Sequence, residues 1–178
     1  HKSSHSFPTR RSSDLYNERL DLLAIIDTLQ DLHYTKIAAH GHSLGAATIA
    51  YSFKEFSNYS FVVLESCYDN IDHAFEHRMK RIHLPLSLAF PIKKFAEMRL
   101  NIDSQELYPE NYMAKINCPV LFFCGDMEWQ NPIFESKKLF DKCASTQKYF
   151  YIFKGAQHQD FLRFSPFVFK NELNKIIE

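Results

Sequence analysis

The spacing of apolar residues along the chain first predicts four helices. Apolar side chains recur every three or four positions over residues 17–32, with charged and amide side chains between them, as in an amphipathic helix. A second helix is expected over about residues 46–53, where small and apolar residues favour packing against a sheet. A third is expected over 131–143, where Pro132 suits a first helical position. The last helix, over about 166–177, begins with a Ser-Pro signal.

Short apolar runs between these helices predict strands. They lie at residues 36–40, 61–64, 120–124 and 148–153, and most of them are rich in Val and Phe. Strands that alternate with helices are typical of βαβ units. We therefore predict an α/β fold with a right-handed parallel sheet that helices cover on both faces.

One segment, about residues 67–109, departs from this alternation. Its pattern predicts two helices, around 71–82 and 86–100, with no strand between them. We interpret the segment as a small helical insertion that stands over the end of the sheet.

Composition then narrows the class of protein. The 178 residues are 46% hydrophobic, and no apolar run approaches the ~18 residues of a membrane span. Basic and acidic residues balance at 21 each, so we expect a small molecule rather than nucleic acid or an anionic membrane as partner. The four cysteines form no Cys-x-x-Cys pair, which argues against a zinc site or a disulfide framework. Reduced thiols favour a cytoplasmic location, and the oligomeric state is left open.

The beginning of the chain differs from the rest. Residues 1–15, HKSSHSFPTRRSSDL, carry Ser and Arg in excess. The run HSFPTRRSSDL resembles the translation of a synthetic adapter used in nucleic-acid sequencing, and a disordered basic arm is the alternative. We expect a non-native or disordered leader over 1–15, a partial domain over 16–178, and the loss of any natural signal peptide.

The motif Gly41-His42-Ser43-Leu44-Gly45 lies where a predicted strand passes into a predicted helix. A sharp turn there can force Ser43 into a strained backbone conformation that projects its hydroxyl into open space. Glycine two residues to either side removes side chains that would collide. The backbone N–H of Leu44, at the start of the helix, can stabilise an oxyanion. The motif therefore indicates a serine nucleophile, and an idle serine in a tight turn is the alternative.

The chain has only four glycines, and the two outside this motif also follow predicted strands. Gly125 and Gly155 open loops that carry three further candidate residues: Asp126, Glu128 and His158. Because the carboxyl ends of parallel strands meet at one edge of a sheet, we expect the serine, an acid and the histidine to converge there.

Four segments resemble the α/β-hydrolase superfamily: HGHSLGAATIAY, VVLESCYDN, YMAKINCPVLFFCGDMEWQNP and FKGAQHQDF. Within it, the chain is most similar to bacterial esterase-like hydrolases of the serine aminopeptidase and dienelactone hydrolase groups. The resemblance implies the C-terminal half of an α/β-hydrolase fold, with nucleophile, acid and base in that chain order. It further implies a hydrolase that cleaves an ester, thioester or amide of a small acyl substrate through an acyl-enzyme, with no cofactor and no metal.

The resemblance also assigns roles to single residues. Ser43 is expected to be the nucleophile and His158 its base. The family pattern Gly-x-x-acid falls on Glu128, where Asp is usual, so Asp126 stays open as the acid and Asp69 is a more distant alternative. His42, beside the nucleophile, is expected to shape the pocket.

Members of this family normally have four more strands before the helix at 17–32, and a loop among them supplies a second oxyanion N–H. Nothing in this chain matches them. Loss of one such donor typically costs ~10²–10³ in rate, and an unpaired apolar strand edge favours aggregation. We therefore expect this chain expressed alone to be poorly soluble and weakly active.

Two other functions compete with the hydrolase hypothesis. The run His73-Ala74-Phe75-Glu76-His77 fits the H-x-x-E-H signature of inverted zinc metalloproteases, with both histidines on one helix face. A solvated helix face explains the same run, and no distinctive third ligand follows it. A non-catalytic binding module with a hydrolase-like fold is the other alternative.

An apolar pocket for an acyl or aryl group could be built from side chains of the insertion and of the two loops. The same side chains at helical spacing would also suit a core. They are Tyr68, Phe75, Leu84, Leu86, Phe90, Phe95, Trp129 and Phe161.

Overall fold

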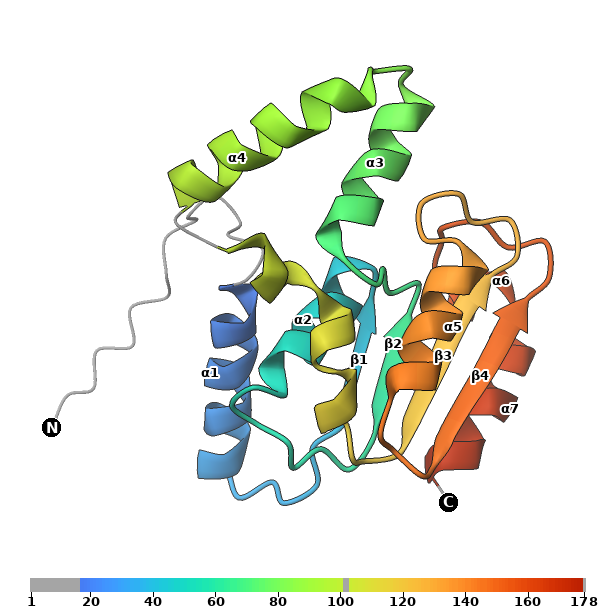
Figure 1. Ribbon diagram of the computed structural model, residues 1–178. Helices are drawn as coiled ribbons and strands as arrows, with labels where there is room; N and C mark the ends of the chain where they lie inside the picture. Colours follow the sequence, from blue (N-terminus) through green and yellow to red (C-terminus); the bar gives the residue numbers. More distant parts are fainter. Residues whose placement is uncertain (1–16, 101–102, 178) are drawn as a thin grey trace, which may run out of the picture.

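The computed structural model describes residues 17–100 and 103–177 of the chain (Figure 1). The predicted leader at 1–15 lies outside the described residues, so the division into leader and domain stays a prediction.

A four-stranded parallel sheet forms the centre of the molecule, in the order β1-β2-β3-β4. Its strands are β1 (Ala39–His42), β2 (Val62–Glu65), β3 (Val120–Gly125) and β4 (Lys148–Phe153). The register sets Gly41 beside Leu64, Leu64 beside Phe122, and Phe122 beside Phe150. Each strand therefore follows its neighbour in the sequence, and all four carboxyl ends point to one edge of the sheet.

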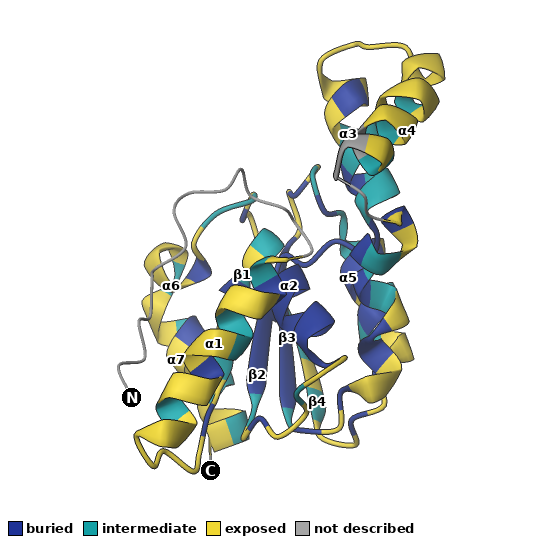
Figure 2. Ribbon diagram, turned by 90° about the vertical axis from the view of Figure 1, so that its left-hand side faces the viewer, coloured by how far each residue is buried: buried dark blue, intermediate teal, exposed yellow. Residues whose placement is uncertain are grey.

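The two faces of the sheet belong to different core clusters, because neighbouring residues of a strand point to opposite faces. In β2, Leu64 packs in the larger cluster and Val63 in the smaller one. The larger cluster includes residues of α1 (Glu18–Asp31), α2 (Leu44–Ser52) and α5 (Ile133–Lys142). The smaller one includes residues of α6 (Phe161–Phe164) and α7 (Pro166–Ile177). Helices thus cover both faces, as predicted, and buried residues concentrate in the central strands β2 and β3 and in α2 (Figure 2).

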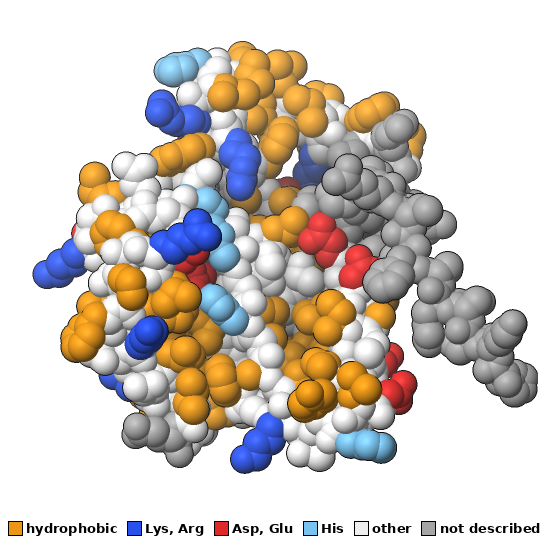
Figure 3. Space-filling model, turned by 180° about the vertical axis from the view of Figure 1, so that it is seen from behind, with side chains coloured by type: hydrophobic (Ala, Val, Ile, Leu, Met, Phe, Trp, Pro, Cys, Tyr) orange, Lys and Arg blue, Asp and Glu red, His pale blue; other side chains and the backbone are white. Residues whose placement is uncertain are grey.

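The segment after β2 forms a helical hairpin that rises above the carboxyl edge of the sheet (Figure 1). It consists of α3 (Ile71–Arg81), the short 3-10 helix η1 (Leu86–Leu88) and α4 (Ala89–Leu100). Three further 3-10 turns lead back to β3: η2 (Ser104–Leu107), η3 (Pro109–Asn111) and η4 (Met113–Lys115). The hairpin is largely exposed, and apolar side chains gather at this end of the molecule (Figures 2 and 3).

Most predicted elements are confirmed, with local corrections. The first strand starts at Ala39 rather than at residue 36, and its register with β2 begins with Ala39 opposite Val62. The helix predicted from residue 131 starts at Ile133, and the extended backbone of Pro132, with ψ of 152°, precedes it. The short helix α6 was not predicted.

Two further observations bear on the class of protein. All four cysteines are buried free thiols. None of the helices formed by residues 17–100 and 103–177 is long and apolar enough to cross a membrane.

Candidate active site

Ser43 stands at a sharp turn between β1 and α2. Its backbone has φ of 55° and ψ of −114°, in the left-handed half of conformational space that a residue with a side chain rarely adopts. The turn is fixed because the Ser43 N–H donates to the Glu65 carbonyl at the end of β2, at 2.8 Å. The strained serine expected from the sequence is therefore present.

The two glycines of the motif serve different purposes. A Cβ on Gly41 would lie 2.4 Å from the carbonyl carbon of Gly45, so the strand can approach the helix only if residue 41 has no side chain. A Cβ on Gly45 would meet no atom within 4 Å. The expectation that both glycines prevent collisions is thus right for Gly41 and wrong for Gly45.

The same hydrogen-bonding step recurs along the carboxyl edge of the sheet. The residue after each of the first three strands donates its N–H to a carbonyl of the next strand: Ser43 to Glu65, Ser66 to Phe123 at 2.8 Å, and Asp126 to Phe153 at 3.2 Å. These three hydrogen bonds hold the strand ends beside one another, so the loops after β1, β2, β3 and β4 lie at one edge of the sheet.

Glu128 is the carboxylate that reaches His158. Its side chain is fully buried, and its Oε2 lies 3.3 Å from Nδ1 of the imidazole. Its other oxygen, Oε1, accepts from the Ser66 hydroxyl and from the Gly125 N–H at 3.1 Å. The carboxylate therefore joins the loop after β4 to the ends of β2 and β3.

The two alternative acids have other partners. Asp126 is exposed and accepts the Gly155 N–H at 2.6 Å, where it supports a turn with φ of 76° at that glycine. Asp69 lies beside His73, 2.9 Å from its Nδ1. Neither carboxylate has a contact with His158 among the described residues.

His158 lies against the turn that carries Ser43. Its ring centroid is 4.6 Å from that of His42, and its side chain is 17% exposed. Among the described residues, His158 forms no hydrogen bond with Ser43. Its ring contact with His42 is the observation that places the imidazole beside the turn. Burial and then the charge of His158 lower the pKa of His42. The Nε2 atom of His42 is buried and has no hydrogen-bond partner in the described structure.

Ser66 and Asn131 complete the surroundings of the acid, and neither was singled out from the sequence. Ser66 is fully buried with φ of 48°, and its carbonyl accepts from the Asn131 side-chain amide. Only the position of Ser66, directly after a strand, could have drawn attention to it.

The apolar side chains proposed for a pocket divide into two groups. Tyr68 and Phe161 are core residues: the Tyr68 hydroxyl contacts that of Tyr51 at 3.0 Å, and Phe161 stacks on Phe153. The exposed group lies mainly on the hairpin and includes Leu84, Leu86, Phe90, Phe95 and Trp129. Phe75 is half-buried.

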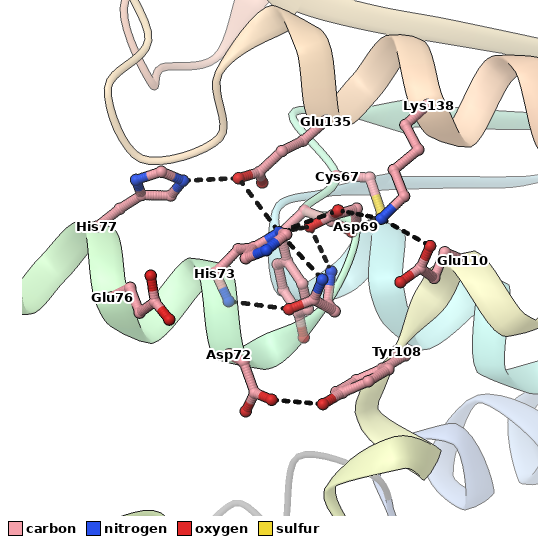
Figure 4. A network of polar contacts seen from close by, with 12 residues as sticks. Cys67, Asp69, Asp72, His73, Glu76, His77, Tyr108, Glu110, Glu135 and Lys138 are labelled. Carbon is pink, nitrogen blue, oxygen red and sulfur yellow. Dashed lines mark hydrogen bonds and ion pairs between the residues drawn. The ribbon is translucent and has the colours of Figure 1, made fainter. Parts of the chain in front are cut away.

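The H-x-x-E-H residues of α3 do not converge on one point. Glu76 forms an ion pair at 3.7 Å with Lys80 of the same helix. His77 instead contacts Glu135 of α5, with 2.6 Å between Nε2 and Oε1 (Figure 4). The two histidines thus face carboxylates from other segments, and Glu76 lies apart from them.

Several solved structures that resemble this one are named as hydrolases, although their sequences differ widely from it. An esterase of Pyrococcus furiosus gives a TM-score of 0.73 at 19% identity, over 95% of this chain and 64% of its own. A monoacylglycerol lipase of Paleococcus ferrophilus gives 0.60 at 19% identity, over 94% of this chain and 78% of its own. An α/β fold family hydrolase of Bacillus anthracis gives 0.66 at 13% identity, over 94% of this chain and 77% of its own.

The chain spans 64% of the length of the Pyrococcus esterase. No protein-family model matches the sequence, and no curated protein matches it either. The likeness to known proteins is therefore structural. Together with the parallel sheet and the strained serine between β1 and α2, it shows that this chain has the α/β-hydrolase fold.

Proposed function

We propose that the chain carries the catalytic residues of a serine hydrolase that cleaves carboxylic esters of small acyl substrates. Ser43 is the nucleophile, His158 the general base, and Glu128 the acid that orients the imidazole. The observation that carries the proposal is the contact of the buried Glu128 carboxylate with His158, whose ring packs beside the strained Ser43 turn.

In the first half of the reaction, the Ser43 hydroxyl oxygen attacks the ester carbonyl carbon, and its proton passes to Nε2 of His158. Glu128 holds the N–H on Nδ1 and stabilises the charged imidazole. The alcohol then leaves with the proton from His158, as the old carbon–oxygen bond breaks. An acyl-enzyme remains on Ser43.

In the second half, a water molecule gives its proton to His158 and attacks the acyl carbon. The bond to Ser43 breaks, and the serine recovers its proton from the imidazole. Both tetrahedral intermediates carry a negative oxygen. The backbone N–H of Leu44, in the first turn of α2, has no acceptor within the helix and is our candidate donor to that oxygen.

Ester substrates are preferred over other acyl compounds because two of the similar structures are an esterase and a monoacylglycerol lipase. Thioesters and amides use the same nucleophile, base and acid. Exposed apolar side chains of the hairpin above the carboxyl edge, such as Leu86 and Phe90, suit an apolar acyl chain.

A fluorophosphonate probe, which reacts covalently with activated serines, tests the proposal directly. We expect the wild-type chain and the exposed control variant Ser60→Ala to be labelled, and Ser43→Ala and His158→Ala to be unlabelled. Wild type and Ser60→Ala should also hydrolyse p-nitrophenyl esters, assayed over increasing acyl length, whereas Ser43→Ala and His158→Ala should not. Labelling that persists in Ser43→Ala would overturn the choice of nucleophile. A folded wild-type chain that resists the probe would favour a non-catalytic binding module.

A further inference from the structure

A second cluster of ionisable groups lies away from Ser43, at the junction of α3 with α5 (Figure 4). Asp69 follows β2, His73 lies in the first turn of α3, and Glu135 lies in the first turn of α5. One ligand atom from each of these three side chains can be chosen so that all lie within 4.8 Å of one another. Asp69 and Glu135 are buried, with 1% and 0% of their side chains exposed.

The carboxylate of Glu135 is incompletely satisfied. Its Oε1 contacts His77 at 2.6 Å and lies 4.0 Å from Nδ1 of His73. Its Oε2 is buried and has no hydrogen-bond partner in the described structure. A buried carboxylate with an unused oxygen is costly, because it has lost water and gained no replacement on that side.

The contacts of His73 are the second observation that points to a cation. Its Nδ1 lies 2.9 and 3.1 Å from the two oxygens of Asp69, and 3.0 Å from the side-chain nitrogen of Asn70. The Asn70 oxygen already accepts the His73 backbone N–H, so its amide nitrogen, a donor, must face the ring. If Nδ1 carries a proton, it can donate to Asp69, but that proton then faces the N–H groups of the Asn70 amide. If Nδ1 carries a lone pair, it can accept from Asn70, but the lone pair then faces the negative carboxylate of Asp69. A cation between Nδ1 and Asp69 removes that repulsion.

We propose that Asp69, His73 and Glu135 bind a divalent transition-metal ion, for which Zn²⁺ is the natural probe. One imidazole and two carboxylates suit first-row metals, and a nitrogen donor disfavours Mg²⁺ and Ca²⁺. The site differs from the sequence expectation of no metal, and of the H-x-x-E-H motif it retains only His73 as a ligand. Its other two ligands are Asp69 and Glu135, the latter from α5.

Neighbouring groups fit this role as outer partners of the ligands. His77 holds Glu135, and Lys138 lies 2.8 Å from both Asp69 Oδ2 and Glu110 Oε2. Hydrogen bonds of this kind commonly orient metal-binding carboxylates. The side chain of His73 is 43% exposed, which gives an ion access from solvent. A bound ion would tie the base of the hairpin to α5.

Zinc binding to the purified chain, followed by calorimetry and by the thermal unfolding midpoint, tests the proposal. We expect one Zn²⁺ per chain and a rise in the midpoint that saturates with Zn²⁺. Glu135→Gln should weaken binding by at least about 100-fold and abolish the rise. Glu76→Gln, on α3 close to His73, is the matched Glu-to-Gln control and should bind as the wild type does.

His73→Gln, at a partly exposed position, repeats the test with a second ligand and decides it if Glu135→Gln fails to fold. Ser43→Ala should bind Zn²⁺ normally, so this result is independent of the proposed hydrolase activity. Zinc that binds Glu135→Gln and His73→Gln as tightly as wild type, or a folded wild-type chain that binds no Zn²⁺, would overturn the site.

Discussion

The imidazole ring of His42 packs on that of His158, with 4.6 Å between their centroids, although His42 belongs to the turn of the candidate nucleophile and His158 follows the last strand. Burial and the nearby His158 lower the pKa of His42, so the folded chain favours its neutral form. The unfolded chain takes up this proton at higher pH. The stability that this shift contributes is therefore fully present above about pH 6.5 and is lost as pH falls through the lowered pKa of the folded chain.

We accordingly predict that His42→Gln shows a smaller loss of stability than wild type between about pH 7 and about pH 5. The measurement is the free energy of unfolding in urea at a series of pH values. The comparison with wild type removes the contribution of the other titrating groups. Parallel curves for the two chains would contradict the prediction.

The identity of the acid can be tested by two isosteric changes in one loop. Glu128→Gln removes the charge that faces His158 and should lower kcat for an ester by up to ~10⁴. Asp126→Asn changes an exposed carboxylate that supports the Gly155 turn and should leave kcat within about threefold of wild type, since exposed substitutions cost little. Equal losses in the two variants would argue against Glu128 as the acid.

Ser66 positions Glu128 through its hydroxyl, and its removal should affect the same chemical step. We expect Ser66→Ala to lower kcat about tenfold, with little change in KM, since a hydrogen bond to a charged group is worth ~1.5–3 kcal/mol. In Glu128→Gln, the additional Ser66→Ala change should have a much smaller effect. Two fully independent losses would show that Ser66 acts through something other than Glu128.

The close approach of β1 to α2 predicts opposite results at the two glycines of the motif. Gly41→Ala would set a Cβ 2.4 Å from the Gly45 carbonyl carbon and should destabilise the chain by ~1–3 kcal/mol or more. Gly45→Ala meets open space in the first turn of the helix and should leave stability unchanged or raised by up to ~1 kcal/mol. Urea midpoints of both variants give the comparison.

Local patterns in the sequence were sufficient for the sheet, the turn at Ser43 and the hairpin. Each depends on residues close together in the chain: apolar runs between polar loops, or glycines around a serine. The strand starts were less accurate, because the start of β1 depends on where its neighbour β2 begins to pair.

The partners of the loop residues could not be predicted with the same certainty. Asp126 and Glu128 lie two positions apart in one loop, and the sequence does not say which one turns inward. In the structure, the backbone N–H of Asp126 donates to the Phe153 carbonyl at the end of β4. The side chain of Glu128 instead turns inward and accepts the N–H of Gly125, the last residue of β3. Similarly, nothing local connects His77 with Glu135, which lie 58 residues apart.

A single carboxylate, that of Glu128, connects three pieces of the chain that meet only after folding: Ser66 directly after the second strand, Gly125 at the end of the third, and His158 after the fourth. Separation of any one of these pieces would detach the imidazole from its acid. The temperature of heat inactivation should therefore be set by the least stable of these three segments rather than by the average stability of the whole molecule. The outer strand β4, whose residues are the least buried of the three, is where that weakness would first appear.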